Sequence, residues 1–266
     1  MRLGDVSPNA PRRGRIAPIE SIVPTNDVAA VNARLRSFTD SRLSLRELGR
    51  VGEYPVLVAT FRGSESPKTR VLLTGGVHGN EPASAGAAVL FIERLLRETE
   101  SVADLEVVVV PALNPIGLTA DTRRNADDLD LNRQALPCSK LPQELQLLTE
   151  VLDSPYDLGL DLHTGVVRRT GFWVLHNGGE DFVGAPVSRF GQRWPLLWNQ
   201  DTPYDMTSPG IGTSTRVGTL KDFFVFHGTP IGITVEAPGS LDYASQVLGL
   251  ADLAAELVDE ARERVG

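Results

Sequence analysis

Two residue types that bind metal ions lie three positions apart at residues 75–82, whose sequence is Gly-Gly-Val-His-Gly-Asn-Glu-Pro. His78 offers an imidazole nitrogen and Glu81 a carboxylate oxygen, and both groups are common zinc ligands. The glycines on either side of His78 allow the backbone to turn tightly around an ion. The spacing therefore predicts half of a zinc site. Taken alone, it also fits a solvated loop between a strand and a helix.

The flanking sequence predicts the elements that position this pair. The apolar run at 71–74 indicates a strand that leads into the motif. Pro82 suits the first position of a helix, where its missing N–H has no cost. Apolar residues then follow helical spacing to about residue 98. The pair is thus expected in a turn at the carboxyl end of a strand.

Three further predicted strands also end beside a polar residue. The strands at 106–110, 158–162 and 231–235 are followed by Asn114, His163 and Glu236. In open α/β sheets, ligands bind outside the carboxyl ends of the strands. We therefore expect these side chains to converge with the first pair on one crevice.

A catalytic zinc ion usually takes three protein ligands and keeps a position open for water. His78, Glu81 and His163 would supply two imidazoles and a carboxylate for one Zn²⁺ per chain. His176 also follows a strand and remains the alternative third ligand. His227 precedes a Gly-Thr-Pro turn and is interpreted as structural.

Two other features suit hydrolysis of an amide bond. Glu236 follows a buried strand and could serve as the base that takes a proton from water, although it could also be an exposed carboxylate at a strand end. The arginines in residues 122–133 could bind a substrate carboxylate in two-point fashion or stabilise an oxyanion. The alternative for this stretch is a charged surface loop with local ion pairs.

The remaining pattern alternates strands with helices, which is typical of the α/β class. Helices are expected near 27–38, 142–152, 181–192 and 241–264, a hairpin at 43–48 and 56–61, and a strand at 172–175. Most of 176–215 is expected to form long loops, and 215–226 has no clear pattern. We expect one domain over 1–266, with an irregular lead-in at about 1–24.

Composition excludes several other functions. The chain has 266 residues, 41% hydrophobic and 23% charged, with a formal net charge of −8, which disfavours a nucleic-acid surface. The single cysteine, Cys138, excludes an intramolecular disulfide. No run approaches the roughly 18 apolar residues of a membrane span, and residues 1–20 lack the apolar core of a secretory signal. A cytoplasmic location is therefore the default expectation, with a mature secreted form as the alternative.

Five motifs together resemble the zinc carboxypeptidase family of carboxypeptidase A, a superfamily that includes the succinylglutamate desuccinylase and aspartoacylase branch. The motifs are His-Gly-Asn-Glu at 78–81, Arg-x-Asn-Ala at 123–126, Asp-Leu-Asn-Arg at 130–133, Asp-Leu-His-Thr at 161–164 and Val-Glu at 235–236. They occur in the family's order over about residues 54–240. The implied fold is a mixed, mostly eight-stranded sheet between helices, a three-layer sandwich.

The resemblance implies a role for each matching residue. His78, Glu81 and His163 would be the zinc ligands, Glu236 the general base, and Arg123 the group that polarises the scissile carbonyl and stabilises the oxyanion. Asn132 and Arg133 would hold the free carboxylate of the substrate, Asp130 would orient His78, and Tyr204 would take the place of the family's mobile tyrosine.

Two substrate classes follow from the resemblance. The implied activity is hydrolysis of an amide bond next to a free carboxylate, in a small peptide or in an N-acyl amino acid. A carboxypeptidase is favoured, but Gln134-Ala135 replaces a common Asn-Phe after Arg133, and Asp-Leu-His-Thr-Gly at 161–165 is closer to the desuccinylase and aspartoacylase branch. The other alternative is a zinc-binding module without catalysis.

Overall fold

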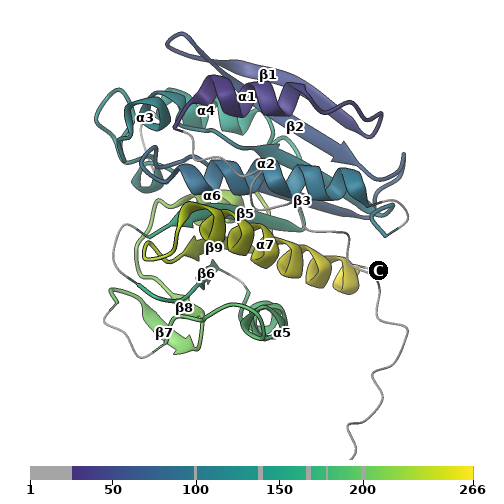
Figure 1. The fold of residues 1–266 in the computed structure, drawn as a ribbon, viewed down its shortest axis with the longest axis vertical. Coiled ribbons are helices and arrows are strands. Elements are labelled where there is room, and N and C mark those ends of the chain that lie inside the picture. Colours follow the sequence, from purple (N-terminus) through teal and green to yellow (C-terminus); the bar gives the residue numbers. More distant parts are fainter. Residues whose placement is uncertain are drawn as a thin grey trace, which may run out of the picture.

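A computed structural model describes residues 26–98, 101–136, 140–165, 169–177, 179–198 and 202–265. The expected lead-in at about 1–24, and Cys138, lie outside these residues. Within the described residues, nine strands form one mixed sheet in the order β1-β2-β4-β3-β5-β9-β6-β8-β7. Helices cover the sheet on both faces (Figure 1). The α/β sandwich expected from the sequence is therefore confirmed, with nine strands in the sheet where eight were expected.

The strands follow one another along the chain with helices between most of them. They are β1 (Leu43–Val51), β2 (Tyr54–Arg62), β3 (Thr69–Thr74), β4 (Leu105–Val110), β5 (Leu158–Thr164), β6 (Trp173–Asn177), β7 (Asp205–Ser208), β8 (Ile211–Thr213) and β9 (Gly232–Ala237). The helices are α1 (Val28–Arg36), α2 (Pro82–Arg97), α3 (Pro115–Ala120), α4 (Gln143–Thr149), α5 (Glu180–Gly191), α6 (Leu220–Phe226) and α7 (Tyr243–Val265), with a 3₁₀ turn at Leu131–Arg133.

Strand alternation divides the buried side chains between the two faces of the sheet. On one face, α1, α2, α5 and α7 pack against every second strand residue, including Leu160 and Val235. On the other face, α4 and α6 pack against the residues between them, such as Leu72 and Val108. Successive side chains of a strand point to opposite faces, so this partition also fixes the face of every polar residue on the central strands.

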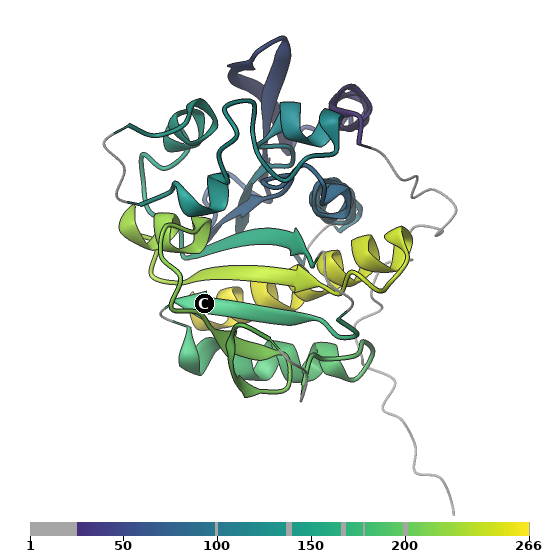
Figure 2. The ribbon, with the colours of Figure 1, turned by 90° about the vertical axis from the view of Figure 1, so that its left-hand side faces the viewer.

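The central strands are parallel and buried on both sides. β3 pairs in parallel with β4 and β5, and β5 pairs in parallel with β9. Every residue of β4 and β5 is buried, which explains why these strands appear in the sequence as apolar or β-branched runs. Figure 2 shows β5, β9 and β6 lying side by side.

One buried ion cluster joins three neighbouring strands. Glu106 of β4 is 4% exposed, and its carboxylate accepts hydrogen bonds from Arg62 Nε at 2.5 Å and Arg70 Nε at 2.8 Å. Burial opposes ionisation of Glu106, but the two arginine hydrogen bonds outweigh it and lower the pKa of this carboxyl group. The carboxylate is therefore held charged between β2, β3 and β4.

Four segments differ from the sequence-based expectation. Residues 205–208 and 211–213, expected in long loops, form β7 and β8 at the edge of the sheet. Both strands are short and partly exposed, so they carry no apolar run. Residues 115–120 form the short helix α3, where the sequence indicated no helix, and 220–226 of the unassigned stretch form α6. Among the described helices, none combines the length and apolar character needed to cross a bilayer.

Candidate active site

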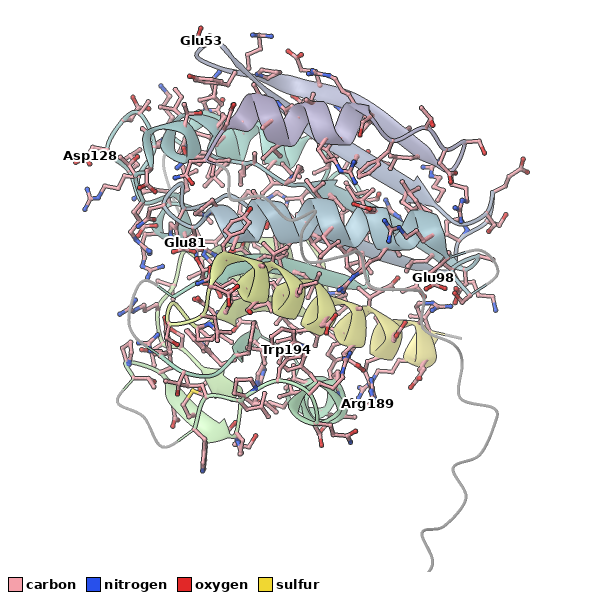
Figure 3. The ribbon with its side chains drawn as sticks, viewed as in Figure 1. Glu53, Glu81, Glu98, Asp128, Arg189 and Trp194 are labelled. Atoms are coloured by element: carbon pink, nitrogen blue, oxygen red, sulfur yellow. The ribbon has the colours of Figure 1, made fainter. Side chains whose placement is uncertain are left out.

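Parallel pairing brings the carboxyl ends of β3, β5 and β9 to one edge of the sheet. Glu81 lies at that edge, where α2 begins, at the opposite end of the helix from Glu98 (Figure 3). On β5, His163 has the opposite parity from Leu160 and Leu162, so it faces away from the α2 and α7 layer. β5 and β9 pair His163 directly with Glu236, and neighbouring positions on one face of a sheet place their side chains side by side.

The loop that carries His78 is held by tight backbone contacts. Gly76 has φ +60°, a conformation that glycine adopts without strain. Asn114 donates from its side-chain amide to the Val77 carbonyl oxygen at 3.3 Å. The backbone of Gly117 passes so close to Gly79 that an added Cβ atom would lie 1.8 Å from a carbonyl carbon. Gly79 is therefore required by its packing against α3. Asn114 holds the loop through its hydrogen bond to Val77.

Three potential metal ligands meet at this edge. One ligand atom from each of His78, Glu81 and His163 lies within 4.8 Å of the others, and all three residues are buried. Glu81 Oε1 is 2.9 Å from His78 Nδ1, and Glu81 Oε2 is 2.9 Å from His163 Nδ1. In the part of the chain that the structure describes, this is the group of histidine and acidic residues that could hold a metal ion.

An aspartate lies behind each imidazole. His78 Nε2 is 3.0 Å from Asp130 Oδ1, and His163 Nε2 is 2.5 Å from Asp161 Oδ2. Asp161 is fully buried and also accepts a hydrogen bond from Thr74 Oγ1 at 2.8 Å. A carboxylate that accepts the Nε2 proton leaves the Nδ1 lone pair available to a cation. The donor set and its orientation therefore fit a zinc ion bound through two Nδ1 atoms and the Glu81 carboxylate.

The charges of these groups support one another. Burial opposes the charged form of Glu81, but the two imidazoles outweigh it and hold the pKa of its carboxyl group far below the usual range. Burial would lower the pKa of both histidines, yet their carboxylate neighbours raise the pKa of His78 and, more strongly, that of His163. Glu81 also accepts the backbone N–H of Thr164 at 2.9 Å.

Glu236 has a different environment from Glu81. Burial raises the pKa of Glu236 to about 7, although the charges of His163, His78 and Arg169 oppose this shift. Within the described residues, no side chain or backbone group donates a hydrogen bond to its carboxylate. A carboxyl group with a pKa near neutrality can both accept and donate a proton in the same cycle.

The residues expected to bind the substrate border the same site. Arg123 donates to Asp130 Oδ2 from Nε at 3.1 Å and to Glu81 Oε1 from Nη1 at 3.3 Å, so its guanidinium lies beside the ligands. The Asn132 side chain is buried. Its Oδ1 accepts a hydrogen bond from the Leu220 N–H at 2.8 Å, and its Nδ2 lies 3.1 Å from His163 Nε2. These contacts make Asn132 part of the wall, and leave Arg133 as the freer of the two expected clamp residues.

A cavity of about 420 Å³ opens over the ligand cluster. The imidazole, acidic and amide residues that border it are His78, Glu81, Asp130, Asn132 and Glu236, and its cations are Arg123, Arg133, Arg169, Arg216 and Lys221. Tyr204 also lines the cavity. Of the residues expected at this crevice, His163 does not border the cavity but contacts Glu81, which does. Asn114 does not border it either, because its side chain is buried against Val77 and Gly117, so the expectation for Asn114 was wrong.

Sequence reasoning missed several residues of the site. Asp161 had a readable signal, because it lies two positions before His163 on a strand and so shares its face. Arg169 and Arg216 had none, since they follow His163 in irregular segments. His176, the alternative third ligand, lies outside the ligand cluster, and its Nδ1 is buried without a hydrogen-bond partner in the described chain. His227 ends α6 and packs on Phe223.

Comparison with known proteins agrees with this geometry. The profile of the succinylglutamate desuccinylase/aspartoacylase catalytic domain matches residues 67–172. A protein of Trichophyton verrucosum named "Probable carboxypeptidase 2" is 32% identical over 133 residues, which are 47% of this chain and 25% of that protein. The chain therefore spans about a quarter of the length of this relative.

Solved structures share the fold at low sequence identity. A candidate metallopeptidase from Shewanella amazonensis superposes with a TM-score of 0.70 at 22% identity, covering 87% of this chain and 90% of that one. A metallo-carboxypeptidase from Burkholderia cenocepacia gives a TM-score of 0.69 at 17% identity, covering 89% and 68%. At this identity the likeness concerns the fold.

Proposed function

We propose that the chain is a zinc carboxypeptidase-like hydrolase, near the succinylglutamate desuccinylase and aspartoacylase branch whose catalytic-domain model matches residues 67–172, and that it hydrolyses an amide bond next to a free carboxylate. The observation that carries this proposal is the meeting of three potential metal ligands with Glu236 and Arg133 at one cavity. The preferred reaction is release of a C-terminal residue from a small peptide.

His78, Glu81 and His163 would hold the zinc ion, and Asp130 and Asp161 would fix the two imidazole rings. When bound, zinc at such a site polarises a carbonyl group and lowers the pKa of water. The side chains around the site would carry out the proton transfers and stabilise the charges of the reaction.

Glu236 is the proposed general base. Its carboxylate faces the same side of the sheet as His163, and burial places its pKa near neutrality. It would take a proton from the attacking water and then deliver that proton to the leaving nitrogen, so that the C–N bond breaks with a neutral amine as the leaving group.

The arginines supply the charge that such a substrate requires. Arg133 is half-buried at the cavity wall and has no carboxylate partner among the described residues, so it can bind the free carboxylate of the substrate through its guanidinium fork. Arg123 lies beside Glu81, close enough to the ligands to stabilise an oxyanion that forms on the scissile carbonyl.

A deacylase of N-acyl amino acids is the second candidate, because the family profile that matches residues 67–172 describes the desuccinylase and aspartoacylase catalytic domain. The two reactions use the same groups on the same type of bond. A zinc-binding module without catalysis would need neither the half-buried base Glu236 nor the oxyanion partner Arg123.

The test combines metal analysis with two substrate series. Elemental analysis of the purified chain should give one zinc ion per chain, and short peptides with a free C-terminus should be cleaved while the same peptides with a C-terminal amide are not. N-acyl amino acids form the second series. Cleavage of these alone would assign the protein as a deacylase, and cleavage of neither would refute the proposed activity.

The Glu236→Gln variant tests the base directly. It should retain zinc while kcat falls by roughly 10²- to 10⁴-fold, the usual contribution of a positioned acid–base group. Glu150→Gln is the matched control, because Glu150 pairs with Arg46 on the surface and does not border the cavity. Equal rates for Glu236→Gln and wild type would remove Glu236 from the mechanism.

A further inference from the structure

Glu144 is a buried carboxylate to which the proposed mechanism gives no role. It lies in the first turn of α4, is 1% exposed and does not border the cavity. Among the described residues, no cation pairs with it. Burial raises the pKa of its carboxyl group, although hydrogen bonds from its own backbone N–H and from Asn125 oppose this shift. Burial of a carboxylate without a cation is costly, so its contacts indicate what it contributes.

Glu144 contacts the loop at residues 123–130. Asn125 Nδ2 donates to Glu144 Oε2 at 3.1 Å and lies 3.3 Å from Oε1. At the other end of the same amide, Asn125 Oδ1 accepts the backbone N–H groups of Asp127 at 3.1 Å and Leu129 at 2.9 Å. The Asn125 side chain therefore connects α4 to the bend at 125–129.

The carboxylate determines which way round the Asn125 amide lies. An ionised carboxylate only accepts hydrogen bonds, so it selects the amide nitrogen and leaves the amide oxygen for the N–H groups of the bend. The backbone closes the same bend, because the Asn125 N–H donates to the Leu129 carbonyl oxygen at 3.0 Å and Asp128 has φ +59°. The Asp128 side chain is 87% exposed on the outside of the bend (Figure 3). The bend is thus anchored on its buried side, through Asn125 and Glu144.

Charged groups of the site lie at both ends of this bend. Arg123, two positions before Asn125 in the chain, donates to Glu81 and to Asp130. Asp130, five positions after Asn125, lies behind the His78 imidazole. Each side chain moves with its backbone, so a shift of the bend would displace both charged groups relative to the ligand cluster.

We infer that Glu144 is a positioning residue, which holds the bend at 125–129 through Asn125 and so sets where Arg123 and Asp130 lie against the ligand cluster. The catalytic part of this inference, through Arg123, rests on the proposed function. The part that concerns zinc affinity, through Asp130, does not depend on hydrolysis. Neither Glu144 nor Asn125 borders the cavity, so both act without touching the substrate.

The Glu144→Leu variant tests this role, because leucine is similar in size and cannot accept the hydrogen bond from Asn125. In the zinc-loaded protein, kcat should fall by roughly 10- to 100-fold, since a misplacement of about 1 Å can cost about 10²-fold in rate. KM should change by less than about threefold, because Asn132 is held separately by the Leu220 N–H and keeps Arg133 in place.

Zinc affinity gives a readout that does not require turnover. Chelator competition without substrate should show roughly two- to tenfold weaker binding in Glu144→Leu, and no weaker than in Asp130→Asn, because Asp130 is displaced and not removed. Leu148→Ala is the matched control, since Leu148 is fully buried one turn further along the same helix. It should lower stability while kcat and zinc affinity stay within about twofold of wild type. If Glu144→Leu matches this control in both quantities, the inference is wrong.

An exchange of donor and acceptor keeps the test valid if Glu144→Leu does not fold. Asn125→Asp retains an acceptor for the N–H groups of the bend but sets a second carboxylate against Glu144, so kcat and zinc affinity should fall at pH 8, which disfavours a shared proton. The double variant Asn125→Asp/Glu144→Gln restores one donor and one acceptor across the contact and should recover both quantities to within about threefold of wild type.

The outcomes of this exchange are decisive in either direction. An Asn125→Asp variant equal to wild type, or a double variant without recovery, would overturn the role of Glu144. If the wild type cleaves no amide, the proposed function fails, and the zinc affinities of the same variants still decide whether Glu144 positions the bend.

Discussion

Asp161 gives the sharpest test of how the site is organised. Its carboxylate is fully buried, lies 2.5 Å from His163 Nε2 and accepts a hydrogen bond from Thr74. Asp161→Asn keeps the size and the contact with Thr74 but removes the negative charge behind the imidazole. Substitution of such a supporting residue typically weakens metal binding by about 10- to 100-fold, or roughly 1.4–2.7 kcal/mol.

Competition with a chromogenic chelator measures this loss directly. Thermal or denaturant unfolding gives a second readout, because free zinc at 100 times Kd stabilises a folded chain by about 2.7 kcal/mol, and a tenfold weaker site retains only about 1.4 kcal/mol at the same zinc concentration. His163→Ala, which removes a ligand, provides the reference for full loss of stoichiometric zinc.

Asp130→Asn is the matched control on the other imidazole. The Asp130 side chain is 19% exposed and is shared with Arg123, so water can replace part of its contact with His78. Its loss should weaken zinc binding less than the loss of Asp161. A change below twofold for Asp161→Asn in a correctly folded protein would refute the orienting role, and retention of stoichiometric zinc by His163→Ala would refute the ligand set.

Three further predictions concern Arg133 in the cavity wall, Glu106 in the sheet and Gly79 in the loop that carries His78. Arg133→Ala should raise KM for carboxylate-bearing substrates by about 10- to 100-fold with a smaller effect on kcat, because it removes a charge-assisted contact, as steady-state kinetics can show. Glu106→Gln should destabilise the protein by about 1–3 kcal/mol at pH 7. Since the folded-state pKa of Glu106 is lowered, its contribution is present above the unfolded pKa and is lost as the pH falls through the folded pKa, so urea unfolding curves of variant and wild type should converge in acid. Gly79→Ala should lower the free energy of unfolding by about 1–3 kcal/mol or more through overpacking against Gly117, and it should impair zinc binding. Gly184→Ala, in an exposed helical position with open space around it, should raise the free energy of unfolding by about 0.5–1 kcal/mol.

Each of these predictions has a result that contradicts it. An unchanged KM in Arg133→Ala would remove the clamp role. A stability difference for Glu106→Gln that does not shrink as the pH is lowered through the acid range would show that packing, and not charge, accounts for its contribution. Equal zinc affinity and equal stability for Gly79→Ala and Gly184→Ala would mean that the close approach of the metal loop to α3 carries no constraint.

The parts of the fold that the sequence predicts are those with a buried pattern. The runs that became β3, β4, β5 and β9 are apolar because both faces of these strands are covered, and their polar ends could be found for the same reason. β7 and β8 lie at the sheet edge with mixed exposure, so no periodicity marks them. The expected number of eight strands came from the family resemblance, and the sheet has nine.

The residues of the site also fall into a predictable group and an unpredictable group. His78, Glu81, His163 and Glu236 follow predicted strands, so their convergence could be inferred from strand direction alone. The positions of Arg169 and Arg216 depend on the paths of irregular segments and on stacking against Tyr204, which no local pattern encodes. The potential metal ligands were therefore accessible from the sequence, whereas the placement of these two arginines in the cavity wall required the three-dimensional arrangement.

The position of β9 in the sheet has a consequence for biosynthesis. This strand lies between β5 and β6, although it follows both in the chain by more than fifty residues. While the ribosome is still translating the segment before residue 232, β5 and β6 each have one unpaired edge, and such edges are prone to intermolecular pairing. A nascent chain of this protein must therefore wait for one late segment before its sheet can close, which favours chaperone protection during translation and slow final folding.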